Sequence, residues 1–303
     1  MEKINYLIFF LLISYTLTAQ DSYTEVPIHL KDNLIYIPIR INQSKTLNFL
    51  FDTGAEVTVL DKATADELGL KIDGTSRIGT AGNPVLSETS PDNTISIGEI
   101  KLDAQSIEIF SIGHLSEYLG LHLDGIIGYE LLRKYIIRTD LDQMKFIITD
   151  SDNLIDQDTG LVIEKIDLEN HHFGLPLTVQ FSKKSEPVIL SFKFDTAFPG
   201  DLVFYNTTVK KYQLMDAGRI HKNKGVGADT TVTHNLRSRV HRVELDDLDW
   251  KNVSATLQVD PVNIEATKKA RAAGLVGNNI LNRFNITYDY RGNKVYMEKR
   301  IKK

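Results

Sequence analysis

The chain has 303 residues, which is enough for two ordinary domains or one large one. Its 42% hydrophobic and 25% charged residues are typical of a soluble globular protein, and its formal net charge of −5 argues against nucleic acid as a partner. It contains no cysteine, which excludes thiol catalysis, iron–sulfur clusters and lipid attachment through cysteine.

Residues 1–19 are predicted to be a signal peptide. Lys3 is followed by an apolar run from Tyr6 to Ile13, and Ala19 precedes the expected cleavage site. The run is too short to span a bilayer. We therefore expect a secreted or periplasmic protein that begins near Gln20 and has no stable membrane span. A membrane anchor is the alternative interpretation of this segment.

The first half of the chain begins with a predicted strand hairpin. The alternating stretch IPIRI (37–41) indicates a half-buried strand, in which proline is tolerated at a sheet edge. The next strand, within KTLNFLFDTG (45–54), brings Asp52 in among apolar residues. Because burying an unpaired charge is costly, Asp52 is either a turn residue that reaches water or a residue held there for chemistry.

Two further elements follow in the first half. Asp61 is the predicted N-cap of a helix over KATADEL (62–68), and Gly69 is expected to end that helix. The glycine-rich stretch GTAGNPV (79–85) predicts a second hairpin.

The second half repeats this order of elements. LPLTV (175–179) and PVILSFKFDTA (187–197) correspond to the first hairpin and end just after Asp195. Asn206 is the predicted N-cap of the following helix, and GVGADTTV (225–232) predicts the second glycine-rich hairpin.

The ends of the two halves correspond most closely. DGIIGYELLRKYIIRTDLDQMKFII (124–148) aligns with AGLVGNNILNRFNITYDYRGNKVYM (273–297), and matched positions such as Gly125 and Gly274 lie 149 residues apart. The acidic, polar stretch between the halves predicts a linker over 151–160. We therefore predict a duplicated all-β chain with an N-terminal lobe over 22–150 and a C-terminal lobe over 161–303.

The duplication gives weight to a motif that is weak by itself. A single Asp-Thr-Gly triplet is more often a turn than an active site. Here FDTG (51–54) and FDTA (194–197) each follow an apolar strand, and each is followed later by an apolar-apolar-Gly segment, IIG (126–128) and LVG (275–277). With these motifs the sequence resembles the aspartic protease superfamily of pepsins and retropepsins over almost the whole mature chain. Its short elements and lack of disulfides are most similar to tandem retropepsin-like proteins of the type exported by bacteria.

The resemblance implies a fold and a catalytic pair. The expected fold has two closed, retropepsin-like β-barrel lobes related by a pseudo-twofold axis, with short helices and an active-site cleft between the lobes. Asp52 and Asp195 would form the catalytic dyad. Two carboxylates held close together share one proton and their pKa values split, so that one serves as base and the other as acid.

The resemblance also implies supporting roles for the neighbours of the two aspartates. Thr53 and Thr196 would hydrogen-bond across the lobe interface and orient the dyad. The backbone N–H groups of Gly54 and Ala197 would hold the carboxylates. Ala197 departs from the family pattern, because glycine is usual at this position and the extra methyl group could crowd the site.

A flap that covers the substrate is the third expected feature. No aromatic residue lies between Ala55 and Leu102, so the flap tyrosine of pepsins is missing. A retropepsin-like flap would not need this tyrosine. The residues expected to form it are Gly79, Thr80, Ala81 and Gly82. A plain surface turn is the alternative interpretation of these residues.

A further difference from pepsins concerns acidity. Pepsins usually carry Ser or Thr after the glycine, and its hydroxyl group donates to a catalytic carboxylate. The matching residues here are Ala55 and Phe198, and neither side chain can donate. Hydrogen bonds to the charged form lower a carboxylate's pKa, so we predict a less acidic dyad than that of pepsins.

The leading hypothesis is an exported aspartic endopeptidase that hydrolyses peptide bonds with water activated between two aspartates. One alternative is a catalytically silent aspartic-protease-like protein that binds peptides in the same cleft. Another is an unrelated duplicated β protein with a structural or surface role. For the enzyme we expect a monomer that acts on peptides or unfolded proteins and needs no cofactor or metal.

Overall fold

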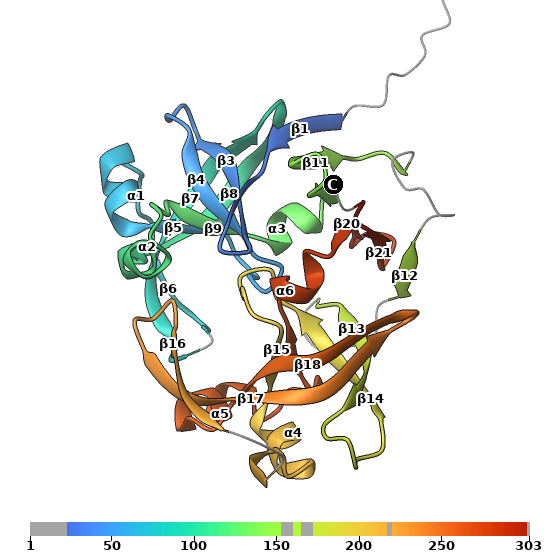
Figure 1. The fold of residues 1–303 in the computed structure, drawn as a ribbon. Coiled ribbons are helices and arrows are strands. Elements are labelled where there is room, and N and C mark those ends of the chain that lie inside the picture. Colours follow the sequence, from blue (N-terminus) through green and yellow to red (C-terminus); the bar gives the residue numbers. More distant parts are fainter. Residues whose placement is uncertain (1–22, 81, 153–159, 165–171, 217–219, 302–303) are drawn as a thin grey trace, which may run out of the picture.

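A computed structural model of the chain describes residues 23–80, 82–152, 160–164, 172–216 and 220–301. These residues form mainly β-strands, which are arranged in three sheets with short helices between them (Figure 1). The all-β fold class predicted from the sequence is therefore confirmed. The predicted signal peptide (1–19) and most of the predicted linker (151–160) lie outside the described residues.

Strands of the first half form an eight-stranded sheet that closes into a barrel. Across the sheet the strands are β2 (His29–Lys31), β3 (Leu34–Ile41), β4 (Leu47–Phe51), β9 (Gly125–Ile127), β5 (Val59–Asp61), β8 (Ile100–Phe110), β7 (Val85–Ile97) and β6 (Thr75–Ile78). The barrel closes because β3 also pairs with β7, with Ile41 opposite Ile95. The strand before Asp52, β4, is flanked by β3 and by the parallel strand β9.

Strands of the second half form a seven-stranded sheet with the same plan. Across the sheet the strands are β13 (Gly174–Gln180), β14 (Val188–Phe194), β19 (Gly274–Val276), β15 (Leu202–Phe204), β18 (Leu248–Leu257), β17 (Val232–Leu245) and β16 (His221–Val226). Pairing of β13 with β17 closes this barrel, and β14 lies parallel to β19 as β4 does to β9. The predicted pair of retropepsin-like lobes is confirmed (Figure 1).

The two halves also share a third sheet, which the sequence analysis did not predict. Its order is β1 (Tyr23–Pro27), β11 (Lys145–Thr149), β10 (Ile136–Asp140), β20 (Phe284–Asp289), β21 (Lys294–Lys299) and β12 (Leu161–Glu164). The antiparallel pairing of β10 with β20 joins the halves, with Arg138 opposite Thr287. The corresponding ends of the two repeats thus pair with each other. The lobe boundaries at 150 and 161 stay a prediction.

The prolines of β3 and β13 lie at positions where no neighbouring strand would accept a hydrogen bond from a backbone N–H. β3 pairs with β4 along one side, but on its other side β2 covers residues 34–36 and β7 covers residues 40–41. Pro38 lies in the gap between these two pairings. Burial alternates from Ile37 to Ile41, as predicted for a half-buried strand, and Pro38 occupies a position where β3 has a neighbouring strand on one side only.

The helices are short. They are α1 (Lys62–Leu68), α2 (Gly113–Leu119), α3 (Tyr129–Leu132), α4 (Asn206–Lys211), α5 (Pro261–Thr267), α6 (Asn278–Leu281) and the 3-10 turn η2 (Leu214–Asp216). The predicted ends of α1 are confirmed, because the Asp61 side chain accepts a hydrogen bond from Ala63 N–H and Gly69 is left-handed. None of the helices in the described part of the chain is long and apolar enough to cross a membrane.

The predicted N-cap of α4 is wrong by one residue. Tyr205 holds the N-cap position, and Asn206 is the first helical residue. The Asn206 side chain is buried and donates from Nδ2 to the carbonyl of Gln258. Asn206 therefore anchors the helix to the strand end after β18 instead of capping it, a tertiary contact that capping preference does not encode.

The aromatic residues that precede the two aspartates anchor both lobes to the shared sheet. Phe51 and Phe194 are buried, and both pack against Tyr288 of β20, with ring centroids 5.8 Å and 6.3 Å away. Phe51 also packs edge-on against Phe146 of β11 at 5.0 Å. Fully burying a side chain of this size stabilises a fold by roughly 1.5–3 kcal/mol. Asp52 and Asp195 are thus each positioned by a preceding phenylalanine, and the two phenylalanines pack in the same core.

Candidate active site

Asp52 begins the loop after β4. Its backbone N–H donates to Ile127 O at 2.9 Å, which continues the pairing of β4 with β9. Its Oδ1 atom accepts a hydrogen bond from Gly54 N–H at 2.7 Å. The side chain is half-buried. The local turn therefore holds Asp52 with its side chain between the core and the surface.

Asp195 has the same surroundings in the second lobe. Its N–H donates to Val276 O at 3.0 Å, and its Oδ1 accepts a hydrogen bond from Ala197 N–H at 3.0 Å. This side chain is also half-buried. The two aspartates thus occupy equivalent places in the duplicated fold.

Thr53 and Thr196 join the two loops through reciprocal hydrogen bonds. Thr53 N–H donates to Thr196 Oγ1 at 2.9 Å, and Thr196 N–H donates to Thr53 Oγ1 at 3.3 Å. Each hydroxyl group then donates to a carbonyl of the opposite strand, Phe194 O at 3.1 Å and Phe51 O at 2.8 Å. Both threonines are buried. These are the contacts across the lobe interface that the resemblance implied.

Electrostatics couple the two carboxyl groups. Burial raises the pKa of Asp52 well above its usual range, although the Gly54 hydrogen bond and the positive charge of Lys193 partly oppose it. Burial, together with the negative charge on Asp52, also raises the pKa of Asp195 well above its usual range. One proton shared between the two groups relieves this repulsion. The pair can therefore present an acid and a base at the same time.

Glycine in the apolar-apolar-Gly segments permits a close backbone approach beneath each loop. A Cβ atom on Gly128 would lie 1.9 Å from the carbonyl oxygen of Asp52. A Cβ atom on Gly277 would lie 2.6 Å from the carbonyl oxygen of Phe198. Any side chain at either position would push the aspartate loop out of place, which explains why these residues accompany the two Asp-Thr motifs.

Ala197 keeps the function expected of glycine at its position. Its N–H still donates to Asp195, and its half-buried methyl group packs against an apolar cluster of the first lobe that includes Leu50 and Ile126. The methyl group therefore adds a contact between lobes.

The predicted flap hairpin reaches the second lobe. Thr80 Oγ1 accepts from Gly82 N–H at 3.0 Å and donates to Asn83 O at 2.9 Å, so these residues form a tight turn. Asn83 N–H donates to Asp229 Oδ2 at 2.7 Å, and Asn83 Nδ2 donates to Thr231 Oγ1 at 3.1 Å. Gly79 precedes this turn in the loop between β6 and β7, and Ala81 lies outside the described residues.

Close contact accounts for glycine at the tip of this hairpin. A Cβ atom on Gly82 would lie 2.5 Å from Asp229 Oδ1. On the first-lobe side, His114 Nε2 is 2.9 Å from the carbonyl oxygen of Gly227. The two glycine-rich hairpins expected from the repeat are therefore present and joined to each other.

Four residues near the site were missed by the sequence analysis. Lys193 lowers the pKa of both aspartates, and Asp229 links the hairpins. Burial raises the pKa of Tyr205 and of Tyr290, and the charges of Asp195 and Asp52, respectively, raise them further. Of these four, only Lys193 could have been found from the sequence, because aligning the two repeats places it opposite the apolar residue Leu50.

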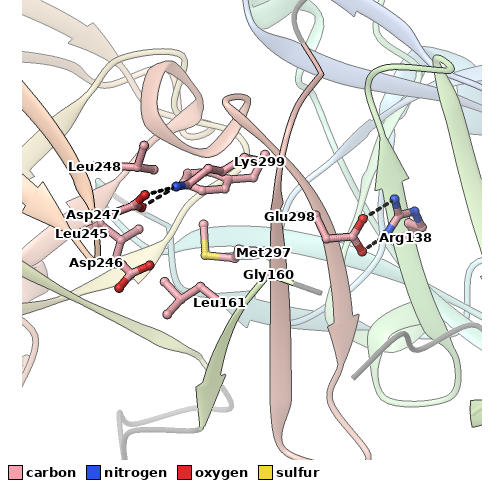
Figure 2. Close-up of a pocket in the computed structure, with 11 residues that line it drawn as sticks. Arg138, Gly160, Leu161, Leu245, Asp246, Asp247, Leu248, Met297, Glu298 and Lys299 are labelled. Atoms are coloured by element: carbon pink, nitrogen blue, oxygen red, sulfur yellow. Dashed lines mark hydrogen bonds and ion pairs between the residues drawn. The ribbon is translucent and has the colours of Figure 1, made fainter. Parts of the chain in front are cut away.

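One cavity of the molecule lies away from the dyad. It has a volume of about 670 Å³ and lies between β21 and the turn joining β17 to β18 (Figure 2). In its lining Lys299 pairs with Asp247, and Arg138 pairs with Glu298 (Figure 2). Neither aspartate of the dyad contributes to it, so the candidate site does not depend on this cavity.

One protein family matches part of the chain. Residues 37–131 match the family model described as aspartyl protease. The matched range begins in β3, includes Asp52, Thr53 and Gly54, and ends in α3 just after Gly128. No curated protein matches the chain.

Proposed function

We propose that the chain is an aspartic endopeptidase of the aspartic protease superfamily that uses Asp52 and Asp195 to hydrolyse peptide bonds, a proposal supported by the match of residues 37–131 to the aspartyl protease family model. The observation that carries the proposal is that two aspartates from separate lobes are held by equivalent turns, and that Thr53 and Thr196 tie the two loops together. The negative charge of Asp52 raises the pKa of Asp195, and a purely structural pair of carboxylates would gain nothing from such repulsion.

The proposed chemistry needs no covalent intermediate. In the singly ionised pair, the carboxylate accepts a proton from a water molecule as the water oxygen attacks the peptide carbonyl carbon. The protonated carboxyl group donates to the carbonyl oxygen. The proton taken from water then moves to the amide nitrogen, the C–N bond breaks, and one hydroxyl group of the intermediate returns its proton to the pair as an acid and an amine leave. The pair ends with one proton, as it began.

Two further expectations form part of the proposal. Both Asp-Thr motifs lie in one chain, so a monomer suffices for activity, and activity should be proportional to protein concentration on dilution. The apolar run at Tyr6–Ile13 supports export, with cleavage after Ala19. N-terminal sequencing of the protein recovered outside the cytoplasm tests export, and retention of Met1 in the active form would contradict it.

The experiment that tests the function is digestion of unfolded casein from acidic to neutral pH, with and without a pepstatin-type inhibitor. The control is the Asp52→Asn variant, purified in the same way. We expect cleavage by the wild type that the inhibitor and the substitution both abolish. Peptide binding without any cleavage would favour the silent peptide-binding protein instead. Cleavage that persists in Asp52→Asn would point to a contaminating protease.

A further inference from the structure

Lys193 lies in β14 two residues before Asp195, and the side chains of both residues leave the chain on the same side. Side chains alternate along a strand, and Phe192 and Phe194 point into the core, where they are 0% and 2% exposed. Lys193 and Asp195 therefore share the opposite side, roughly 7 Å apart along the chain. The lysine side chain is half-buried, and its positive charge acts on both aspartates.

The repeat shows what Lys193 replaces. The equivalent residue of the first lobe, two positions before Asp52, is Leu50, which is 4% exposed and belongs to an apolar cluster. In the antiparallel neighbour strand, Tyr36 lies opposite Leu50, whereas Gly174 lies opposite Lys193. The first lobe thus fills this place with an aliphatic and an aromatic side chain. The second lobe has a cation beside a residue without a side chain.

The two sides of the dyad therefore differ in chemistry. Around Leu50, the first-lobe cluster continues into half-buried Ala55, Val57 and Leu115, which suit an apolar side chain. On the second-lobe side, the Lys193 ammonium group suits a carboxylate, and burial makes such a pair stronger than it would be in water. A peptide that crosses the dyad has one side chain on each side of the bond to be cut.

We propose that Lys193 determines specificity by binding an acidic side chain, Asp or Glu, of the peptide residue that lies against β14. The residue across the scissile bond lies against the Leu50 cluster and is apolar. This proposal rests on the proposed function, because it assumes that a peptide occupies the dyad.

The test compares peptides that differ only in Glu or Gln at one of the two positions flanking the cleaved bond. For the wild type we expect kcat/KM to favour Glu over Gln at one position by about tenfold or more, the range of a hydrogen bond to a charged group. Lys193→Met should remove this preference and Lys193→Arg should keep most of it. Lys183→Met, in the exposed turn before β14, is the matched control and should behave as wild type.

Two results would overturn the proposal. One is an equal loss of kcat/KM for the Glu and Gln peptides in Lys193→Met, which would mean that Lys193 acts on the dyad alone. The other is a wild type with no Glu preference at either position. If no peptide is cleaved, calorimetry of the same peptides with the wild type and Lys193→Met separates the two proposals. If the wild type binds the Glu peptide more tightly than the Gln peptide and Lys193→Met does not, the proposed specificity is supported even though the hydrolytic function fails.

Discussion

The backbone N–H of Asn83 donates a 2.7 Å hydrogen bond to the carboxylate of Asp229, and this contact joins the hairpin of one lobe to the hairpin of the other. Asp229 also accepts hydrogen bonds from its neighbour Thr231. Apolar residues at the turns of these hairpins, Ile78, Val85 and Ala228, pack against the same cluster as Ala55 and Ala197 of the aspartate loops. The joined hairpins therefore lie next to the candidate active site.

Removal of the Asp229 carboxylate should loosen this contact. We expect the Asn83 amide hydrogen to exchange about tenfold faster in Asp229→Ala, because its acceptor is lost. Glu186→Ala, in an exposed turn of the second lobe, is the control and should leave the exchange rate unchanged. Equal exchange in wild type and Asp229→Ala would show that the contact does not hold the hairpins together in solution.

The hydrogen bond from Asn83 to Asp229 should weaken as the pH falls. Burial raises the pKa of Asp229, but the hydrogen bonds from Thr231 and Asn83 outweigh burial and leave it below its usual value. A carboxylate with a lowered pKa stabilises the folded form above its unfolded pKa, and that stabilisation disappears as the pH falls through the folded value. Asn83 exchange, corrected for intrinsic rate, should therefore accelerate only in strongly acidic solution.

Replacement of either dyad aspartate should abolish hydrolysis without unfolding the protein. We expect Asp52→Asn and Asp195→Asn each to lower kcat by about 10³-fold or more, because either change removes one partner of the acid–base pair. Asp66→Asn, on the exposed side of α1, is the matched control and should keep wild-type kcat. Near-wild-type turnover in either dyad variant would exclude this mechanism.

The raised pKa of the dyad also predicts how stability changes with pH. A carboxyl group whose pKa is higher in the folded state binds more protons there than in the unfolded state. Its contribution is fully present below the unfolded pKa and is lost as the pH rises through the folded value. The wild type should therefore lose stability from mildly acidic to neutral pH, and Asp195→Asn should lose less. Parallel denaturant midpoints for the two proteins across this range would contradict the coupling.

Much of this site follows from the sequence because its contacts need particular residue types. The Asp-Thr pairs, Gly128 and Gly277 leave such a signature, although their contacts join segments far apart in the chain. The Asp61 cap of α1 is of the same kind. The pairing of β10 with β20 and the contact of Asn83 with Asp229 join segments more than 140 residues apart, and no local preference encodes them. Lys193 is an intermediate case. Its own strand gives no signal, and only comparison with Leu50 of the first repeat shows that a cation replaces an apolar residue.

The hydroxyl groups of Thr53 and Thr196 should be needed as a pair. Thr53→Val and Thr196→Val each leave buried backbone groups without a partner, which should cost about 1–3 kcal/mol of unfolding free energy per substitution. Because the two side chains share one network, the double variant should lose clearly less than the sum. Serine at either position keeps the hydroxyl group and is the control. Additive losses in denaturant titrations would show that the network does not act as a unit.

A hydroxyl group beside Asp52 should move the acid limit of activity. Ala55 follows the Asp52 turn: its N–H donates to Asp52 O at 3.1 Å, and its side chain has no group that could donate to the carboxylate. A serine at this position places a hydroxyl group within the same turn. A hydrogen bond to the ionised carboxylate favours the charged form and lowers its pKa. The acidic limb of the kcat/KM profile should therefore move to lower pH in Ala55→Ser, while the wild type works best in mildly acidic or near-neutral solution.

Ala55→Val, which adds bulk without a donor, separates the hydrogen bond from a change of packing. Identical acidic limbs in wild type and Ala55→Ser would show that the missing hydroxyl does not set the acidity of the dyad.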